Sequence, residues 1–207
     1  MSNLARNTTL GILILLSALS ISCQLVPSTS SSWQVNKSLY READPTKTRI
    51  EVSIWDQKAW LLDEQGRVIL KTNVSTGVPG HETPTGEHKV VEKLEHKRSN
   101  KYGKFVDAKT GKVIVEKNWL HEGPPPEGSV YEGTDMPYWM RLTWDGIGMH
   151  VGKFPTHTRC SFGCIRVYHK AQPLIYRKTR VGTRVSISEG SLLKSMAKKE
   201  DFSWINY

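Results

Sequence analysis

Short segments that alternate polar and apolar residues, separated by turn-forming residues, constrain the fold of this chain most. The run from Arg49 to Ile54 alternates in this way, and the runs Ala59 to Leu62 and Arg67 to Val74 follow it across turn signals at Asp56-Gln57 and Gln65-Gly66. A period of two places successive side chains on opposite faces of a strand. We therefore expect three strands joined as a β-meander.

Further strands and a helix are expected around this meander. The predicted strands are Glu87 to Leu94, Tyr138 to Thr143, Ile147 to Val151 and Val181 to Ile187. A helix is predicted from Tyr168 to Lys178, with Pro173 near its first turn, where proline is tolerated. The fold class that follows is mainly β, with two packed or barrel-like mixed sheets and a short helix after Cys164.

The stretch from 95 to 135 is less regular. It holds a run from Glu122 to Gly128 that contains three prolines, which neither a helix nor a central strand accepts. Two interpretations stay open here: an insertion or lid over a cleft, or a solvated surface loop. The same stretch carries a basic cluster, made of Lys97, Arg98, Lys101 and Lys104.

The N-terminal segment has the features of an export signal. Residues 1–9 contain an arginine and no acid, and the apolar run from Leu10 to Ile21 is about a dozen residues long, too short for a membrane span. We expect a signal peptide at residues 1–22 and export to the bacterial cell envelope. Cys23 follows Ser20-Ile21-Ser22, which resembles a lipobox, so it is a candidate lipidation site and membrane anchor. Ordinary cleavage near this point is the alternative.

The rest of the chain is divided by composition. Residues 23–45 are expected to hold the lipidation candidate and a flexible tether, because Gln24 to Ser32 is rich in Ser, Thr and Pro. Residues 46–188 are long enough for one domain with a real core. Residues 189–207 are expected to form a C-terminal tail, with a short helix near Ser191 to Lys199.

The segment from Gly148 to Val167 concentrates reactive groups. Cys164 follows Gly163 directly and precedes Arg166 by two residues, while His150 lies upstream in the same segment. A thiol reacts only as the thiolate, so a catalytic cysteine needs an imidazole or a positive field nearby. Gly163 permits a strained turn whose amides can face a substrate carbonyl. These residues predict a cysteine nucleophile with His150 as its base.

Other uses of the same residues stay open on the sequence alone. Cys160 and Cys164 can form a disulfide in an exported protein. They can also bind zinc together with His157 and His169, which have the spacing of a compact ligand set. His150 can equally be a hydrogen-bonded core residue.

Two separated motifs resemble the L,D-transpeptidase family with a YkuD-type catalytic domain. One comprises the run from Met136 to Gly152 followed by Ser161 to Arg166, and the other is the Ser75-Thr-Gly to Thr83-Pro-Thr-Gly86 loop. The resemblance implies Cys164 as nucleophile and His150 as base, the latter oriented by the carbonyl of Val151 or Gly152.

The resemblance assigns the neighbouring residues as well. It implies the amides of Gly163 and Cys164 as oxyanion donors, and it places Ser161, Arg166 and Gly152 in the substrate-binding site. One position departs from the family pattern: Phe162 stands where the family has a histidine. The chain must then do without a second imidazole or borrow His157. His81 is expected to be a solvated loop residue.

The net charge of +9 favours an anionic partner. Export argues against nucleic acid, which leaves anionic envelope polymers and lipid headgroups. With the resemblance, the expected function is transfer of a peptidoglycan stem tetrapeptide from a Cys164 thioester to an amine, with release of D-Ala and without a metal or organic cofactor. The alternatives are an L,D-carboxypeptidase, and a catalytically silent peptidoglycan-binding lipoprotein.

Overall fold

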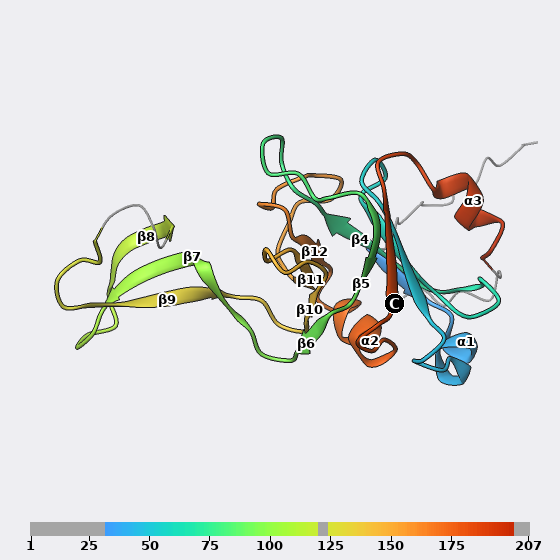
Figure 1. Cartoon of the computed structure of the whole chain (residues 1–207), viewed down its shortest axis with the longest axis horizontal. Coiled ribbons are helices and arrows are strands. Elements are labelled where there is room, and N and C mark those ends of the chain that lie inside the picture. The colour runs from blue at the N-terminus through green and yellow to red at the C-terminus, as the bar shows by residue number, and fades with distance from the viewer. Residues whose placement is uncertain (1–31, 120–123, 201–207) are drawn as a thin grey trace, which may run out of the picture. The chain divides into compact units, whose positions relative to one another are not determined.

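The computed structural model describes residues 32–119 and 124–200, and Figure 1 labels its elements. The expected meander is present as strands β2 (Arg49–Ser53), β3 (Lys58–Leu62) and β4 (Val68–Ser75). Each strand pairs antiparallel with the next. The meander prediction is therefore confirmed.

The meander lies in the middle of a larger mixed sheet, whose order is β5-β13-β2-β3-β4-β12-β11-β10-β6. Strand β4 is the branch point, because β3 pairs with it along one edge, while β1 (Trp33–Val35) pairs with residues 70–72 and β12 (Ile165–Val167) with residues 74–75 along the other. Two pairs are parallel: β13 with β2, and β11 with β12. The remaining strands of this sheet are β5 (Gly86–Lys89), β6 (Glu92–Leu94), β10 (Trp139–Arg141), β11 (Gly148–Val151) and β13 (Arg184–Ser188).

The prediction of one strand from Glu87 to Leu94 is wrong. The chain forms β5 and β6 here, and these strands lie at opposite ends of the sheet order. Between them, the N–H of Val90 donates to Thr183 O, whereas the N–H of Val91 donates to Arg141 O. The chain thus changes partners between two adjacent residues, a change that the local alternation pattern does not reveal.

Three strands between residues 98 and 135 form a second sheet, so this stretch is more regular than predicted and is not simply a surface loop. The sheet is antiparallel, with β7 (Arg98–Asp107) between β8 (Val113–Trp119) and β9 (Ser129–Asp135). Val113, Ile114 and Val130 are exposed, so apolar residues here do not mark a core face and the sequence shows no consistent period. The expected basic cluster is partly neutralised, because Arg98 pairs with Glu132 and Asp135 and Lys104 pairs with Glu132.

One apolar core is shared by the strands on both sides of β4 in the large sheet. It brings together side chains from the meander, from β10 to β13 and from two helices, so these strands pack around the same interior. The core comprises, among others, Leu39, Ile50, Val52, Leu61, Leu70, Val74, Met140, Met149, Ile165, Val167, Ile175, Val185 and Ile187.

The expected helix after Cys164 is present as α2 (Gln172–Arg177), which begins later than predicted and carries Pro173 in its first turn. The predicted C-terminal helix is α3 (Leu193–Ala197), which contributes Met196 to a small cluster with Trp60 and Val68. Both helices pack their buried residues against the large sheet, which explains why such short segments hold their shape.

The tether prediction is wrong for residues 33–45. This stretch contains β1 and helix α1 (Lys37–Glu42), whose first turn is capped by the side chain of Asn36, 3.1 Å from Leu39 N. The domain therefore extends further towards the N-terminus than residue 46. The signal peptide, Cys23 and the tether up to residue 31 lie outside the described residues, as do residues 201–207. Across the ranges 32–119 and 124–200, no helix is long and apolar enough to cross a membrane.

Candidate active site

The parallel pairing of β11 with β12 places His150 and Cys164 on the same face of the sheet. In that pairing His150 lies opposite Arg166. Residues two apart in an extended chain share a face, so Cys164, two residues before Arg166, lies on the same face of the sheet as His150. Met149 and Ile165 are buried in the core on the other face. The parallel register thus brings nucleophile and base candidates to one side.

The imidazole of His150 is held in one tautomer. Its Nδ1 atom lies 2.8 Å from the carbonyl oxygen of Val151, which can only accept, so Nδ1 carries the proton and Nε2 is the basic nitrogen. The expectation that a backbone carbonyl at Val151 or Gly152 orients this histidine is confirmed for Val151. The Trp139 ring packs 5.9 Å from the imidazole, centroid to centroid, and its Nε1 donates to Glu92. His150 is only 6% exposed.

The thiol of Cys164 lies in a mostly apolar setting. It donates weakly to the carbonyl of Gly146, 3.7 Å away, and its sulfur accepts from the N–H of Gly148. Burial raises the pKa of the Cys164 thiol above its usual value. The Gly148 N–H, then the charges of Arg166, Lys101 and Arg141, lower this pKa, but by less than burial raises it.

The pKa of His150 moves in the opposite direction. Burial lowers it from 6.5 to about 4, and the charge of Arg166 adds to this, while the hydrogen bond to Val151 acts against it. At neutral pH the resting pair is therefore a neutral thiol and a neutral imidazole.

The turn that carries Cys164 depends on Gly163, whose φ is +101°. A side chain at this position would be strained by that φ, and its Cβ would lie 2.5 Å from Ile147 Cδ1. The carbonyl of Gly163 accepts from the Thr83 hydroxyl at 2.7 Å, and the same hydroxyl accepts from Gly77 N at 2.9 Å. The predicted strained turn is present, and the distant loop from Ser75 to Gly86 supports it.

A second set of contacts joins the same loop to the residues before Cys164. Gly77 forms a parallel bridge with Ser161, and Val78 N donates to Ser161 O. The Ser75 hydroxyl lies 3.1 Å from the sulfur of Cys160 and accepts from Cys160 N. The two motifs singled out in the sequence thus form one continuous site.

The match to known families agrees with this geometry. The YkuD family model, described as the L,D-transpeptidase catalytic domain, matches residues 47–187. The chain belongs to this family. No curated protein sequence matches it closely.

Solved L,D-transpeptidases share the fold. The structure is similar to those from Mycobacterium smegmatis (19% identity, TM-score 0.50, 69% of this chain and 58% of that chain covered) and from Stackebrandtia nassauensis (18%, 0.50, 72% and 58%). A third is the L,D-transpeptidase LdtMt1 in complex with imipenem (19%, 0.50, 68% and 58%). The chain spans less than two thirds of the length of each. At these identities, the likeness concerns the fold.

Three residues expected to bind substrate in this L,D-transpeptidase domain have other contacts. Ser161 is buried and its hydroxyl donates to Cys164 O, so it shapes the turn that carries Cys164. Gly152 lets the Arg166 side chain pack on it, since a Cβ there would lie 2.7 Å from Arg166 Cγ. Arg166 donates to Lys153 O and contacts the sulfur of Cys160 at 3.4 Å. Its charge still reaches Cys164 and His150.

The disulfide and zinc alternatives are not realised. Cys160 and Cys164 are both free. In the described part of the chain, which includes His157 and His169, no three His, Cys, Asp or Glu side chains come close enough to hold a metal ion. His157 is exposed at a turn with φ +58°.

Sequence reasoning missed several residues at this site. His81 is exposed in its loop, as expected, but its imidazole also contacts Phe162, and the other ring on Phe162 is Tyr102 of β7. The position of His81 inside the Ser75 to Gly86 motif was a usable signal for this contact. The sequence held no such signal for Tyr102, because its contact with Phe162 depends on how the second sheet folds.

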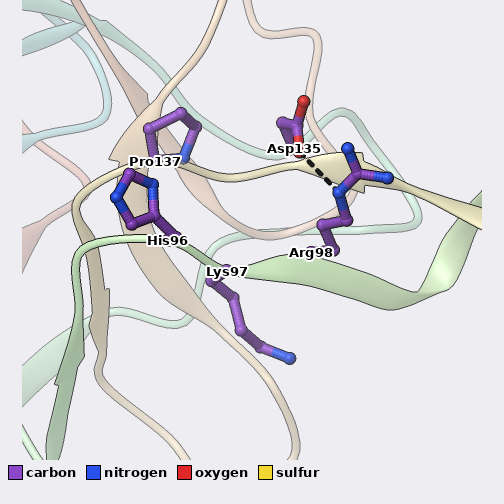
Figure 2. Close-up of a pocket in the computed structure, with 5 residues that line it drawn as sticks. All are labelled: His96, Lys97, Arg98, Asp135 and Pro137. Carbon is purple, nitrogen blue, oxygen red and sulfur yellow. Dashed lines mark ion pairs between the residues drawn. The ribbon is translucent and has the colours of Figure 1, made fainter.

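A separate cavity of about 490 Å³ lies where β6 leads into β7 and β9 leads into β10 (Figure 2). It is lined by His96, Lys97, Arg98, Asp135 and Pro137. Figure 2 shows that the Lys97 ammonium points away from His96 and Pro137, and that Arg98 is engaged by Asp135. The lining cations do not converge on one point, and neither Cys164 nor His150 lines the cavity.

Proposed function

We propose that this chain is a peptidoglycan L,D-transpeptidase that uses Cys164 as nucleophile and His150 as general base. The observation that carries the proposal is the shared face of β11 and β12, with His150 Nδ1 donating to Val151 O so that Nε2 can take a proton. The family match to residues 47–187 supports the reaction class.

In the proposed first step, Nε2 of His150 takes the proton of the Cys164 thiol as the sulfur attacks the carbonyl carbon of the third residue of a stem tetrapeptide. The pair is neutral at rest, so charge separates only as attack proceeds. The amides of Gly163 and Cys164 stabilise the developing oxyanion, a role that the left-handed Gly163 turn supports. The imidazolium then protonates the D-Ala amine, which leaves, and a thioester remains.

In the proposed second step, the amine of a neighbouring stem peptide attacks the thioester carbon. The C–N bond forms, the C–S bond breaks, and the amine proton returns through His150 to the sulfur. The positive charges near Cys164, from Arg166, Lys101 and Arg141, suit substrates that carry carboxylates. No metal or organic cofactor takes part in this proposal.

Intact-mass spectrometry with imipenem tests the nucleophile, since imipenem is present in the solved LdtMt1 complex. We expect one covalent adduct on the wild type and on Cys160→Ala, and none on Cys164→Ala. The Cys160→Ala variant is the matched control because it removes the neighbouring thiol. An adduct that persists on Cys164→Ala would place the nucleophile elsewhere.

Muropeptide analysis tests the acceptor. New cross-links made from tetrapeptide donors are expected for a transpeptidase. Trimmed tripeptides without cross-links would identify an L,D-carboxypeptidase, in which water resolves the thioester. Bound but unchanged muropeptides would identify a silent peptidoglycan-binding protein.

We further propose that residues 1–22 direct export and that Cys23 anchors the protein to the membrane of the cell envelope. Metabolic labelling with a fatty acid, compared between wild type and Cys23→Ser, tests the anchor. Label on both proteins or on neither would contradict it.

A further inference from the structure

Three rings from separate segments meet next to Cys164. Phe162 stacks on Tyr102 of β7, with ring centroids 5.3 Å apart and planes 20° apart, and the edge of His81 meets Phe162 at 4.7 Å and 87°. Phe162 lies two residues before Cys164 and its side chain is 42% exposed. The cluster of Phe162, Tyr102 and His81 therefore forms an aromatic wall beside the turn that carries Cys164.

The local backbone fixes Tyr102 in this wall. The pairing of β7 with β9 is interrupted between Arg98 and Gly103. Within the interruption, the Ser99 hydroxyl accepts from Lys101 N at 3.1 Å and from Tyr102 N at 2.9 Å. Such an irregularity re-aims a side chain away from the regular strand alternation. It explains how Tyr102, although it belongs to a strand of the second sheet, reaches Phe162 in the Cys164 turn.

A further contact ties β7 to the turn that contacts the thiol. The Lys101 ammonium donates to Asp145 O at 3.4 Å, in the turn whose Gly146 carbonyl faces the Cys164 sulfur. The pKa of Tyr102 is raised by burial and then by the charge of a Cys164 thiolate, so its hydroxyl lies within electrostatic reach of the sulfur. Lys101 thus contacts Asp145, next to Gly146, and Tyr102 contacts Phe162, two residues before the nucleophile.

The ring of the wall that is nearest to Cys164 in sequence, Phe162, is apolar and partly exposed. A phenyl ring offers a water molecule no strong hydrogen-bond partner, so water that approaches across Phe162 loses hydrogen bonds that bulk solvent supplies. An acceptor amine held by its own peptide does not depend on that route. An aromatic wall of this kind slows hydrolysis more than aminolysis.

We propose that the stack of Phe162 on Tyr102 is the specificity-determining element that selects an amine over water as acceptor for the thioester on Cys164. The inference rests on the proposed function and deepens it. In hydrolysis, a water oxygen bonds to the acyl carbon, the C–S bond breaks, the sulfur takes a proton, and a carboxylic acid leaves. In aminolysis, an amide forms in place of the acid with the same fate for the sulfur.

The lifetime of the imipenem thioester, followed by intact mass, tests the wall in the full chain. We expect the adduct to form on Phe162→Ala and Tyr102→Ala, and to be lost to water about tenfold faster than on wild type. Tyr102→Phe keeps the stacked ring and should keep the wild-type lifetime. Trp55→Ala is the matched control, because Trp55 is a strongly exposed aromatic in the turn after β2 and belongs to neither motif.

The acceptor choice itself is measured with a tetrapeptide donor and a second stem peptide as acceptor. The ratio of cross-linked product to trimmed tripeptide is expected to fall about tenfold in Phe162→Ala and to stay unchanged in Trp55→Ala. A Phe162→Ala adduct that forms normally, with unchanged lifetime and product ratio, overturns this inference and leaves the proposed function standing. Failure of the wild type to form any adduct overturns both.

Discussion

The hydroxyl of Thr83 donates to the carbonyl oxygen of Gly163 at 2.7 Å and accepts from Gly77 N–H at 2.9 Å. One buried side chain therefore joins the glycine that precedes the candidate nucleophile to the first of the two sequence motifs. The Cys164 turn is built on the loop from Ser75 to Gly86, and its shape depends on that loop.

Replacing Thr83 with valine keeps the side-chain volume but removes the hydroxyl. Gly77 N–H and Gly163 C=O would both lose a partner in a buried place, so we expect a loss of about 1–3 kcal/mol in the free energy of unfolding. Because the Gly163 carbonyl loses its hydrogen bond, the turn that carries Cys164 is held less firmly, so imipenem acylation should slow even in the folded protein. Thr83→Ser retains the hydroxyl and should resemble wild type. Urea unfolding and acylation rates measure the two effects, and normal acylation of Thr83→Val would contradict the link.

Stability should depend on pH through His150. The unfolded imidazole has a pKa near 6.5, whereas burial lowers the folded value to about 4. Between these values the unfolded chain binds the proton and the folded chain does not, so stability is full above pH 6.5 and is lost as the pH falls towards 4. The difference between the two pKa values corresponds to about 3 kcal/mol in the free energy of unfolding.

Urea titrations from pH 7 to pH 4 on wild type and His150→Gln measure this contribution. Other titrating groups act on both proteins, so the difference between the two curves isolates His150. We expect the wild type to lose about 3 kcal/mol more than the variant over this range. Parallel curves would show that the imidazole is not buried in its neutral form.

The fold could be predicted where local pattern and burial agree. Strand β2 largely alternates, β3 and β4 are almost fully buried runs bounded by turn signals, and Pro173 marks the first turn of α2. The pattern failed between Glu87 and Leu94, because the exchange of partners from Thr183 to Arg141 at adjacent residues is a tertiary event. It failed again in residues 98–135, where exposed valines remove the usual contrast between faces.

The candidate site could be predicted in part. Spacing and chemistry drew attention to Cys164, His150 and Gly163 but left a disulfide, a zinc site and a core histidine open, and only the resemblance of two motifs to the family chose between these uses. Their protonation could not be read from the sequence, because burial, which sets both pKa values, depends on the whole sheet. The Tyr102 contact also depends on a distant strand, through the interruption at Ser99.

Thiol chemistry should report the neutral resting pair. Because burial raises the pKa of Cys164, little thiolate exists at pH 7, and alkylation by iodoacetamide should accelerate continuously as the pH rises through 9. A preformed ion pair would instead react at a nearly constant rate from pH 6 to pH 9. With Cys23 also replaced by serine, the Cys160→Ala background restricts the signal to Cys164, and the Cys164→Ala background reports Cys160 alone. An alkylation rate on Cys160→Ala that does not change with pH would show a preformed thiolate–imidazolium pair instead.

Gly163→Ala should damage the site more than the fold. The new Cβ would occupy a left-handed φ of +101° and would lie 2.5 Å from Ile147 Cδ1, which together cost about 1–3 kcal/mol. Relief of that strain moves the amides of residues 163 and 164, so acylation by imipenem should fall by at least about a hundredfold. Gly111→Ala is the matched control, because its φ is +70° with open space around the Cβ, so it carries backbone strain away from Cys164. Equal acylation by the two variants would show that the turn does not position the oxyanion donors.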